Sequence, residues 1–384
     1  MKQVTIKLSA IVLLLAGSIS AANAQTDKIN VVTTAVPFLR ISPDARGGGM
    51  GDAGIATAAD ANAAFWNLAK TPFATQKSSV SLSYTPWLSD LKLNDVYFVS
   101  LSGYHQLDET QSISASLRYF SLGNIQFTDN NGAELGSSRP REFAFDAGYS
   151  RKLSKKIGLG IALRYINSSL AKGNVNGTTY KAGTSVAGDV HFYYKGTNAS
   201  GNGFDYGVTL SNLGSKISYT SDANQKDYIP ANLGLGIAYN KVFDADSKIT
   251  FALDLNKLLV PTPPAKGTDT SAAAATAYAN AIKDYHTKSV VSSWFSSLGD
   301  GEDAKEFTFA LGAEYWYKNQ FAFRAGYFSE NKLKGDRRFF TLGAGLKYNT
   351  YGLNFSYLLP SGSGVSRNPL SNTLRFSLMF DLGK

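Results

Sequence analysis

Hydrophobic and polar residues alternate along fourteen segments between residue 77 and the end of the chain. In residues 248–256 the odd-numbered positions are apolar and most even-numbered ones are small or polar: Ile249, Phe251, Leu253 and Leu255 against Thr250, Ala252, Asp254 and Asn256. Because successive side chains of a strand point to opposite faces, each segment predicts a strand with one apolar and one polar surface. The predicted strands are 77–87, 95–106, 112–120, 142–153, 156–166, 182–195, 204–213, 230–242, 247–258, 306–317, 320–330, 338–348, 351–359 and 373–383.

The links between these segments alternate in length. Even-numbered links are mostly short, as at 107–111 and 154–155, whereas odd-numbered links are mostly long, as at 121–141 and 259–305. Outer-membrane barrels have short periplasmic turns and long extracellular loops, and they close because unpaired backbone groups in lipid are costly. We therefore predict an all-β fold, a transmembrane antiparallel β-barrel of about 14 strands with both termini in the periplasm. A soluble β-sandwich explains the alternation within strands but not the alternation of loop lengths.

The first residues have the features of a secretory signal. Lys2 and Lys7 supply positive charge before an apolar stretch at 8–19, and residues 22–24 (Ala-Asn-Ala) form a cleavage site. These features predict a signal peptide at 1–24. About twelve apolar residues are too few for a membrane-spanning helix. The chain contains no cysteine, which excludes a lipoprotein anchor, disulfides and thiolate chemistry.

Residues 25–76 do not follow the strand pattern, and they contain a glycine-rich motif followed by an alanine-rich stretch. Glycine lets a backbone take tight or left-handed conformations, and small side chains fit a narrow cavity. We therefore predict that 25–76 plug a barrel formed by 77–384. The predicted plug motif comprises Arg46, Gly47, Gly48, Gly49, Met50, Gly51, Asp52, Gly54, Phe65, Trp66 and Asn67.

The longest link, 259–305, differs in composition from the others. Prolines stiffen its start, and residues 271–283 are rich in alanine and favour a helix. The residues that follow include a candidate partner-binding group of apolar side chains: Val290, Val291, Trp294, Phe295 and Leu298. An apolar segment outside the membrane either folds over the barrel mouth or binds a partner, and the sequence leaves both open.

The order of these features resembles the FadL-like superfamily of outer-membrane transporters. Within it, the run ISPDARGGGMGDAGIATAADANAAFWN at 41–67 resembles the PorV family of the type IX secretion system in Bacteroidetes bacteria. The resemblance covers essentially the whole chain after the predicted signal. One position departs from it, because Leu68 stands where the family usually has proline.

The PorV resemblance implies a non-enzymatic outer-membrane component that takes cargo proteins from the secretion translocon to a sortase-containing attachment complex. The FadL-like resemblance implies an alternative, a channel for hydrophobic small molecules such as long-chain fatty acids. A third hypothesis is a structural barrel that binds lipopolysaccharide. The formal net charge of +9 and the pI near 9.3 favour an anionic lipopolysaccharide surface over nucleic acid, since the basic residues are scattered.

The sequence offers little for catalysis, cofactors or metals. Residues 49–54 match G-x-G-x-x-G, but the strand, helix and acidic residue of a dinucleotide site are absent around them, so we interpret them as a structural turn. His105, His191 and His286 do not cluster, and neither a catalytic triad nor a set of metal ligands surrounds them. We therefore expect no enzyme activity, no cofactor and no metal.

Charged residues also fall on the inward positions of the predicted strands. They admit two interpretations, a polar pathway through the lumen or mutual pairing with each other and the plug, and we favour pairing because enclosed charges are usually paired. The set comprises Arg118, Asp146, Arg164, Asp189, Asp205, Asp254, Arg324, Arg375 and Asp381.

Overall fold

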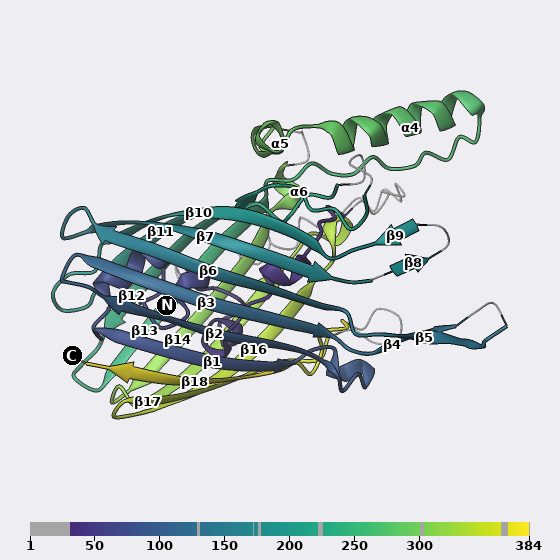
Figure 1. The fold of residues 1–384 in the computed structure, drawn as a ribbon. Helices are drawn as coiled ribbons and strands as arrows, with labels where there is room; N and C mark the ends of the chain where they lie inside the picture. The colour runs from purple at the N-terminus through teal and green to yellow at the C-terminus, as the bar shows by residue number, and fades with distance from the viewer. Residues whose placement is uncertain are drawn as a thin grey trace, which may run out of the picture.

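Fourteen antiparallel strands close into a barrel in the computed structural model, which describes residues 31–128, 131–171, 173–175, 178–221, 226–299, 303–361 and 368–383 (Figure 1). The predicted fold class is confirmed. The signal peptide predicted at 1–24 lies outside the described residues. The barrel strands are β1 (Ser78–Pro86), β2 (Val96–Gln106), β3 (Gln111–Leu122), β6 (Arg141–Lys152), β7 (Ile157–Ser169), β10 (Gly183–Lys195), β11 (Gly203–Gly214), β12 (Asn232–Val242), β13 (Ser247–Leu258), β14 (Thr308–Tyr317), β15 (Phe321–Ser329), β16 (Arg338–Tyr348), β17 (Tyr351–Leu358) and β18 (Leu374–Leu382).

The first and last strands complete the ring, since β1 pairs with β18 in a register that sets Leu82 opposite Leu378. Along β1 the side chains alternate between the inside and the outside of the barrel. Ser79, Ser81 and Ser83 are buried, whereas Val80 and Leu82 are 39% and 48% exposed. Closure leaves no strand edge unpaired, and the outer surface presents the apolar row to lipid.

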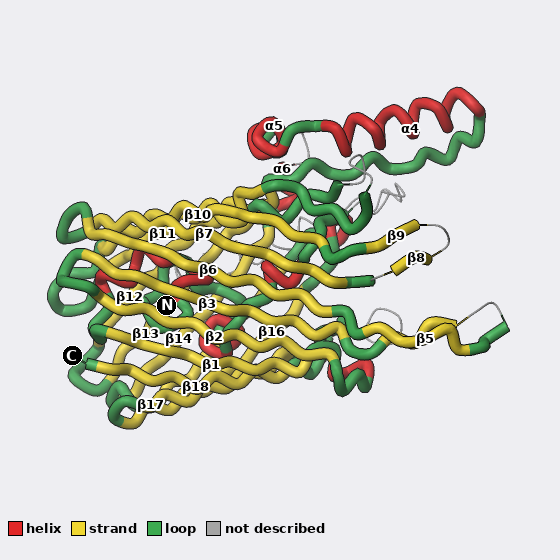
Figure 2. The backbone as a smooth tube through the Cα atoms, viewed as in Figure 1, coloured by secondary structure: helices red, strands yellow, loops and turns green. Residues whose placement is uncertain are grey.

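The links sort to opposite ends of the barrel, which we call the turn end and the loop end. Figure 2 shows the short connections and the chain's C-terminus at the turn end, and the long connections at the other. Two hairpins extend the loop end beyond the predicted strands: β4 (Ile125–Thr128) with β5 (Glu134–Ser138), and β8 (Gly173–Val175) with β9 (Thr178–Tyr180). Such short segments provide too little alternation to be recognised from sequence.

Helices occur in the long link between β13 and β14 and in two other loops. The elements are α4 (Ala272–Thr287), α5 (Val290–Ser296), α6 (Asp303–Glu306), η3 (Ser89–Leu91) and η4 (Lys332–Lys334). Ser271 and Ser289 cap the first turns of α4 and α5, each accepting a hydrogen bond from a backbone amide. The predicted start of a strand at residue 306 is wrong, because Glu306 ends α6. No helix within the described residues is both long and apolar enough to cross a membrane.

Residues 31–76, which we call the plug, run through the inside of the barrel (Figure 1). Their short helices are η1 (Pro37–Arg40), α2 (Ala45–Gly49), α3 (Ala63–Trp66) and η2 (Leu68–Phe73). Phe38 and Leu39 pack in an apolar cluster with Phe98 of β2 and Ile166 of β7, near the loop end. Met50 packs in a second cluster against inward residues from β12 to β17.

Candidate functional site

The glycine motif lets the plug backbone approach both its own Trp66 and the barrel wall. A Cβ atom on either Gly47 or Gly54 would overlap the indole ring of Trp66. The indole Nε1 donates a hydrogen bond of 2.8 Å to Asp44, which also accepts from the amide of Gly47 at 2.8 Å. Burial raises the pKa of the Asp44 carboxyl above its usual range, and the nearby Asp60 adds to that rise. The motif thus forms a turn that encloses Trp66.

A second part of the motif lies directly against barrel strands. Gly51 has a left-handed φ of +70° and lies so close to Tyr327 that an added Cβ would be 2.5 Å from its amide nitrogen. The amide of Gly51 donates to Thr341 Oγ1 at 2.9 Å, and that hydroxyl donates to the carbonyl of Gly49 at 3.1 Å. Gly49 lies 3.1 Å, measured from its ideal Cβ position, from the Cα of Gly343. Gly326 on the barrel meets Gly51, since a Cβ on Gly326 would lie 2.0 Å from the Gly51 amide nitrogen, so glycine fits on both surfaces where they meet.

The guanidinium of Arg46 ties the plug to the wall of the barrel. It forms ion pairs of 2.8 Å with Glu314 of β14 and with Asp60 of the plug. Glu314 also pairs with Arg324 of β15 at 2.7 Å. Because Glu314 is almost fully buried, its two arginine partners offset the cost of removing its charge from water.

Asp254 of β13, the strand next to β14, also holds the plug. Its carboxylate accepts hydrogen bonds from the amides of Gly54 at 2.6 Å and Ile55 at 2.8 Å. The ammonium of Lys70 donates to the carbonyl of Gly54 at 2.6 Å. Burial lowers the pKa of Lys70 to about 8, against the attraction of Asp60. The turn after the motif is thus held by Asp254 of the barrel and by Lys70 of the plug itself.

The remaining motif residues also contact the barrel. Asn67 donates through Nδ2 to the carbonyl of Phe192 in β10 at 2.9 Å. Arg118 lies over the ring of Phe65, 5.4 Å from its centroid. Asp52 has a positive φ of 63° and lies 3.4 Å from Arg375 of β18.

The inward charges of the strands are paired, as we favoured from the sequence. Asp146 pairs with both Arg118 and Arg164, and Asp189 pairs with Arg164 at 2.7 Å. The other inward charges find polar partners as well: Asp205 accepts from the amides of Gly196 and Thr197, and Asp381 pairs with Lys347 at 2.5 Å. The charges thus stabilise the wall and the plug rather than lining an open polar path.

The candidate partner-binding group lies at the loop end, on and just after α5. Figure 1 shows α4 and α5 beyond the loop end of the barrel. Phe295, Val291 and Leu298 are 73%, 55% and 45% exposed, whereas Val290 and Trp294 are partly buried. Lys216, after β11, holds this segment, since its ammonium donates to the carbonyls of His286 and Lys288 at 2.8 Å each. The segment is anchored while its apolar side chains face outward.

The three histidines lie apart from one another, as the sequence suggested. His191 is fully buried, 3.8 Å from Asp189; His105 hydrogen-bonds to Ser78; and His286 faces the carbonyl of Lys226. Within the described residues, His, Asp and Glu side chains form no group suited to a metal ion.

Some residues of the plug–barrel interface escaped sequence reasoning. Glu314 was not among the inward charges identified from the sequence, and nothing in the sequence linked it to Arg46, 268 positions away. Arg40 and Ser42, which line an internal cavity, carried no signal apart from lying at the edge of the resembling run. Lys216 was also missed, because its carbonyl partners on His286 and Lys288 lie at the end of α4, about 70 positions along the chain.

Three comparisons relate the chain to known proteins. A family model described as type IX secretion system protein PorV matches residues 23–265, more than half of the chain. No curated protein matches it. Among solved structures, the CymD monoaromatic hydrocarbon channel superposes with a TM-score of 0.55 at 11% identity, covering 90% of this chain and 99% of that one. The Ralstonia pickettii toluene transporter TbuX gives a TM-score of 0.51 at 11% identity, with the same coverages.

A Pseudomonas aeruginosa FadL homologue also matches, with a TM-score of 0.47 at 12% identity over 92% of this chain and 99% of that one. At these identities the structural likeness shows the fold alone, a closed β-barrel. The family model matches the whole of the glycine motif and the strands from β1 to β13. The chain therefore belongs to the PorV family of type IX secretion system proteins, and its barrel is an outer-membrane barrel.

Proposed function

We propose that this barrel receives secreted proteins from the type IX translocon at its loop end and passes them to a surface attachment complex that contains a sortase. Family membership supports a role in type IX secretion. The observation that carries the finer proposal is the exposed apolar group on α5, where Val291, Phe295 and Leu298 face outward from an anchored segment. Exposed apolar side chains gathered at one place mark sites for protein partners.

The plug supports this proposal because a carrier of cargo proteins must keep the membrane sealed. The ion pair from Arg46 to Glu314 and the amide bonds to Asp254 join the plug to the neighbouring strands β14 and β13. The glycines at 49, 51 and 326 allow backbone-to-backbone packing that leaves little room between plug and wall. We propose that cargo stays on the rim and does not pass through the lumen.

The test is a triple variant, Val291→Ser, Phe295→Ser and Leu298→Ser, expressed in the native host. We expect it to lose most of the translocon, sortase and cargo proteins that co-purify with the wild-type barrel. Hot-spot side chains each contribute about 1–2 kcal/mol or more to an interface, so removing three lowers affinity by at least roughly a hundredfold. Mass spectrometry of the purified complexes measures the loss.

The matched control is Leu91→Ser with Leu93→Ser, which removes exposed apolar side chains (55% and 40% exposed) from another loop at the same end. Both variants must keep the heat-modifiable gel mobility of a folded barrel. Undiminished co-purification in the α5 variant would show that cargo binds elsewhere.

The fold neighbours favour a second candidate, uptake of a hydrophobic small molecule, since CymD is a monoaromatic hydrocarbon channel and TbuX a toluene transporter. It predicts that purified barrel in liposomes admits toluene faster than protein-free liposomes do. Five arginines line a cavity inside the barrel near the loop end, and this cationic lining disfavours a path for hydrocarbons. Lipopolysaccharide as a bound partner stays a prediction, and lipid analysis of the same native purifications tests it.

A further inference from the structure

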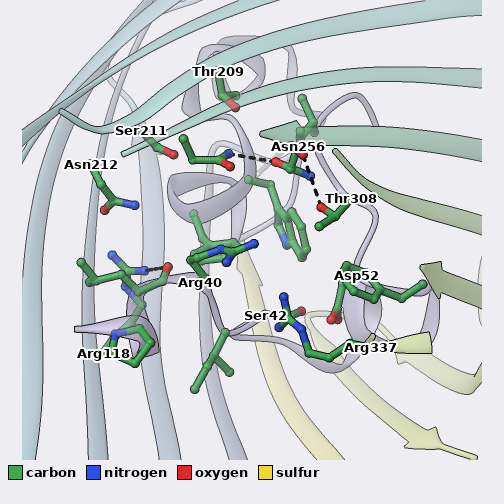
Figure 3. Close-up of a pocket in the computed structure, with 18 of the residues that line it drawn as sticks. Arg40, Ser42, Asp52, Arg118, Thr209, Ser211, Asn212, Asn256, Thr308 and Arg337 are labelled. Carbon is green, nitrogen blue, oxygen red and sulfur yellow. Dashed lines mark hydrogen bonds between the residues drawn. The ribbon is translucent and has the colours of Figure 1, made fainter. Parts of the chain in front are cut away.

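A cavity of about 150 Å³ lies inside the barrel near the loop end, between the plug and the wall. Figure 3 shows plug residues Arg40, Ser42 and Asp52 converging on it, with Arg118 on one side and Arg337 below. This volume is well below the roughly 300–1,000 Å³ of sites for drug-sized ligands, so it suits a small group. A neighbouring cavity of about 260 Å³ shares Arg40 and Arg337 with it.

The lining of the first cavity is strongly cationic. Five arginines line it against a single carboxylate, that of Asp52: Arg40, Arg118, Arg164, Arg337 and Arg375. Most of these arginines are neutralised nearby. Asp146 and Asp189 balance Arg118 and Arg164, Glu330 pairs with Arg337 at 2.7 Å, and Asp52 lies 3.4 Å from Arg375.

Arg40 is the exception. Its guanidinium makes no hydrogen bond or ion pair with any residue that the structure describes. Burial and the positive charge of Arg337 lower the pKa of Arg40 to about 10, which Glu330 only partly opposes. Arg40 is partly buried and only the charge of Glu330 offsets the cost of its desolvation, so a bound anion would relieve the remainder.

Three residues that line the same cavity carry further donors without protein partners. Ser42 Oγ, Arg118 Nε and Arg375 Nε are all buried and lack a hydrogen-bond partner among the described residues. Their side chains belong to residues that are 2%, 1% and 3% exposed. Buried polar groups are nearly always hydrogen-bonded, so three unpaired donors around one cavity are unusual. They come from the plug and from strands β3 and β18, which are separated in the barrel wall by β1 and β2.

We propose that this cavity binds the oxyanion of a small ligand, a carboxylate or a phosphate, with Arg40 supplying the charge and Ser42 a hydrogen bond. Guanidinium groups suit both anions because their N–H donors match two oxygens at once. The aromatic rings of Phe65, Trp87 and Phe339 also line the cavity, so the oxyanion can belong to a ligand with an apolar ring. This site is independent of the cargo-binding role proposed for α5.

The test is isothermal titration calorimetry of the full-length barrel in a neutral detergent. Inorganic phosphate and acetate serve as free anions, and phenyl phosphate and benzoate as anions with an apolar ring. We expect at least one probe to bind with a stoichiometry of one and Arg40→Gln to weaken that binding roughly tenfold or more, since hydrogen bonds to charged groups contribute about 1.5–3 kcal/mol. Tighter binding of the ring-bearing probes would identify an amphipathic ligand, and equal binding a free anion.

The control is Arg338→Gln, which removes an arginine whose side chain is 49% exposed and paired with Asp336 outside the cavity. Arg40→Lys keeps the charge and should retain part of the affinity. Gel mobility before and after heating verifies that each variant folds, and Ser42→Ala replaces Arg40→Gln as the test if the latter does not. Absence of binding by all four probes at millimolar concentration, or equal affinity in wild type and the cavity variant, overturns the proposal.

Discussion

Lys70 carries its ammonium group into the interior of the plug, where its side chain is only 1% exposed. Its hydrogen bond to the Gly54 carbonyl holds the turn that follows the glycine motif. Burial favours the neutral amine, which is why the pKa of Lys70 falls from 10.5 to about 8. The residue thus stabilises the plug by its bond and destabilises it by its charge.

This balance predicts a pH dependence. Between pH 8 and 10.5 the unfolded chain holds a proton that the folded chain has released, so the free energy of unfolding rises with pH over that window. Below about pH 8 both states are protonated and the cost of the buried charge is fully present. Relative to Lys70→Met, wild type should gain at most about 3 kcal/mol across the window.

Urea titration of the folded barrel in lipid vesicles, at several pH values, measures this difference. Both proteins share every other titrating group, so the comparison isolates Lys70. Parallel profiles for wild type and Lys70→Met would mean that the ammonium is not desolvated as described.

The sequence predicted at residue scale that the glycine motif allows tight backbone packing. It did not indicate the partners of the glycines, because the indole of Trp66 and the backbone of β15 reach them only through folding. Arg46 and Glu314 illustrate the same limit. Each was recognisable as charged, but their pairing depends on where the plug lies in the lumen.

At the scale of elements, the barrel strands were predictable because a period of two follows from backbone geometry and because one face meets lipid. β16 matches its predicted range of 338–348, and β13 matches 247–258. The hairpins β4–β5 and β8–β9 were missed, since strands of three to five residues provide too little alternation. The alanine-rich segment at 271–283 does form a helix, α4, which continues to Thr287.

Lys216 helps to hold the end of α4, together with Tyr228, whose hydroxyl donates to the carbonyls of Tyr285 and Lys288. This predicts how the long loop behaves. In Lys216→Met the two hydrogen bonds to the carbonyls of His286 and Lys288 are lost, as is the cation–π contact with Tyr228 at 4.0 Å. Loss of these contacts removes roughly 1.5–3 kcal/mol of local stability. We expect proteinase K to cleave the 265–299 segment about tenfold faster or more, while the barrel stays intact.

Lys266→Met is the matched control, because it removes an exposed lysine from the same loop. Mass spectrometry of the first cleavage products locates the cut. Unchanged cleavage in Lys216→Met would show that other contacts fix the loop.

At the scale of the whole molecule, closure of the sheet decides which surface meets lipid. Leu163, near the middle of β7, is 70% exposed on the outer face, whereas its neighbours Ala162 and Arg164 are buried inside. Leu163→Lys should destabilise the barrel by about 2–4 kcal/mol, the cost of a lysine near the bilayer midplane. Urea unfolding in vesicles measures the change.

Leu153→Lys provides the comparison, since Leu153 is 60% exposed in the turn between β6 and β7. That position lies at the turn end, where the cost of a lysine falls to roughly 0–1 kcal/mol. Equal destabilisation by both substitutions would contradict the assignment of the membrane-facing band.

The sequence by itself determined the all-β class, the number of barrel strands and the separation of short turns from long loops. These follow from local periodicity and chain connectivity, which need no knowledge of distant contacts. The tertiary structure alone decided which charges pair, how the plug meets the wall, and that Arg40 and Ser42 line one cavity with Arg375. Such arrangements depend on residues hundreds of positions apart, and only closure of the barrel around the plug brings them together.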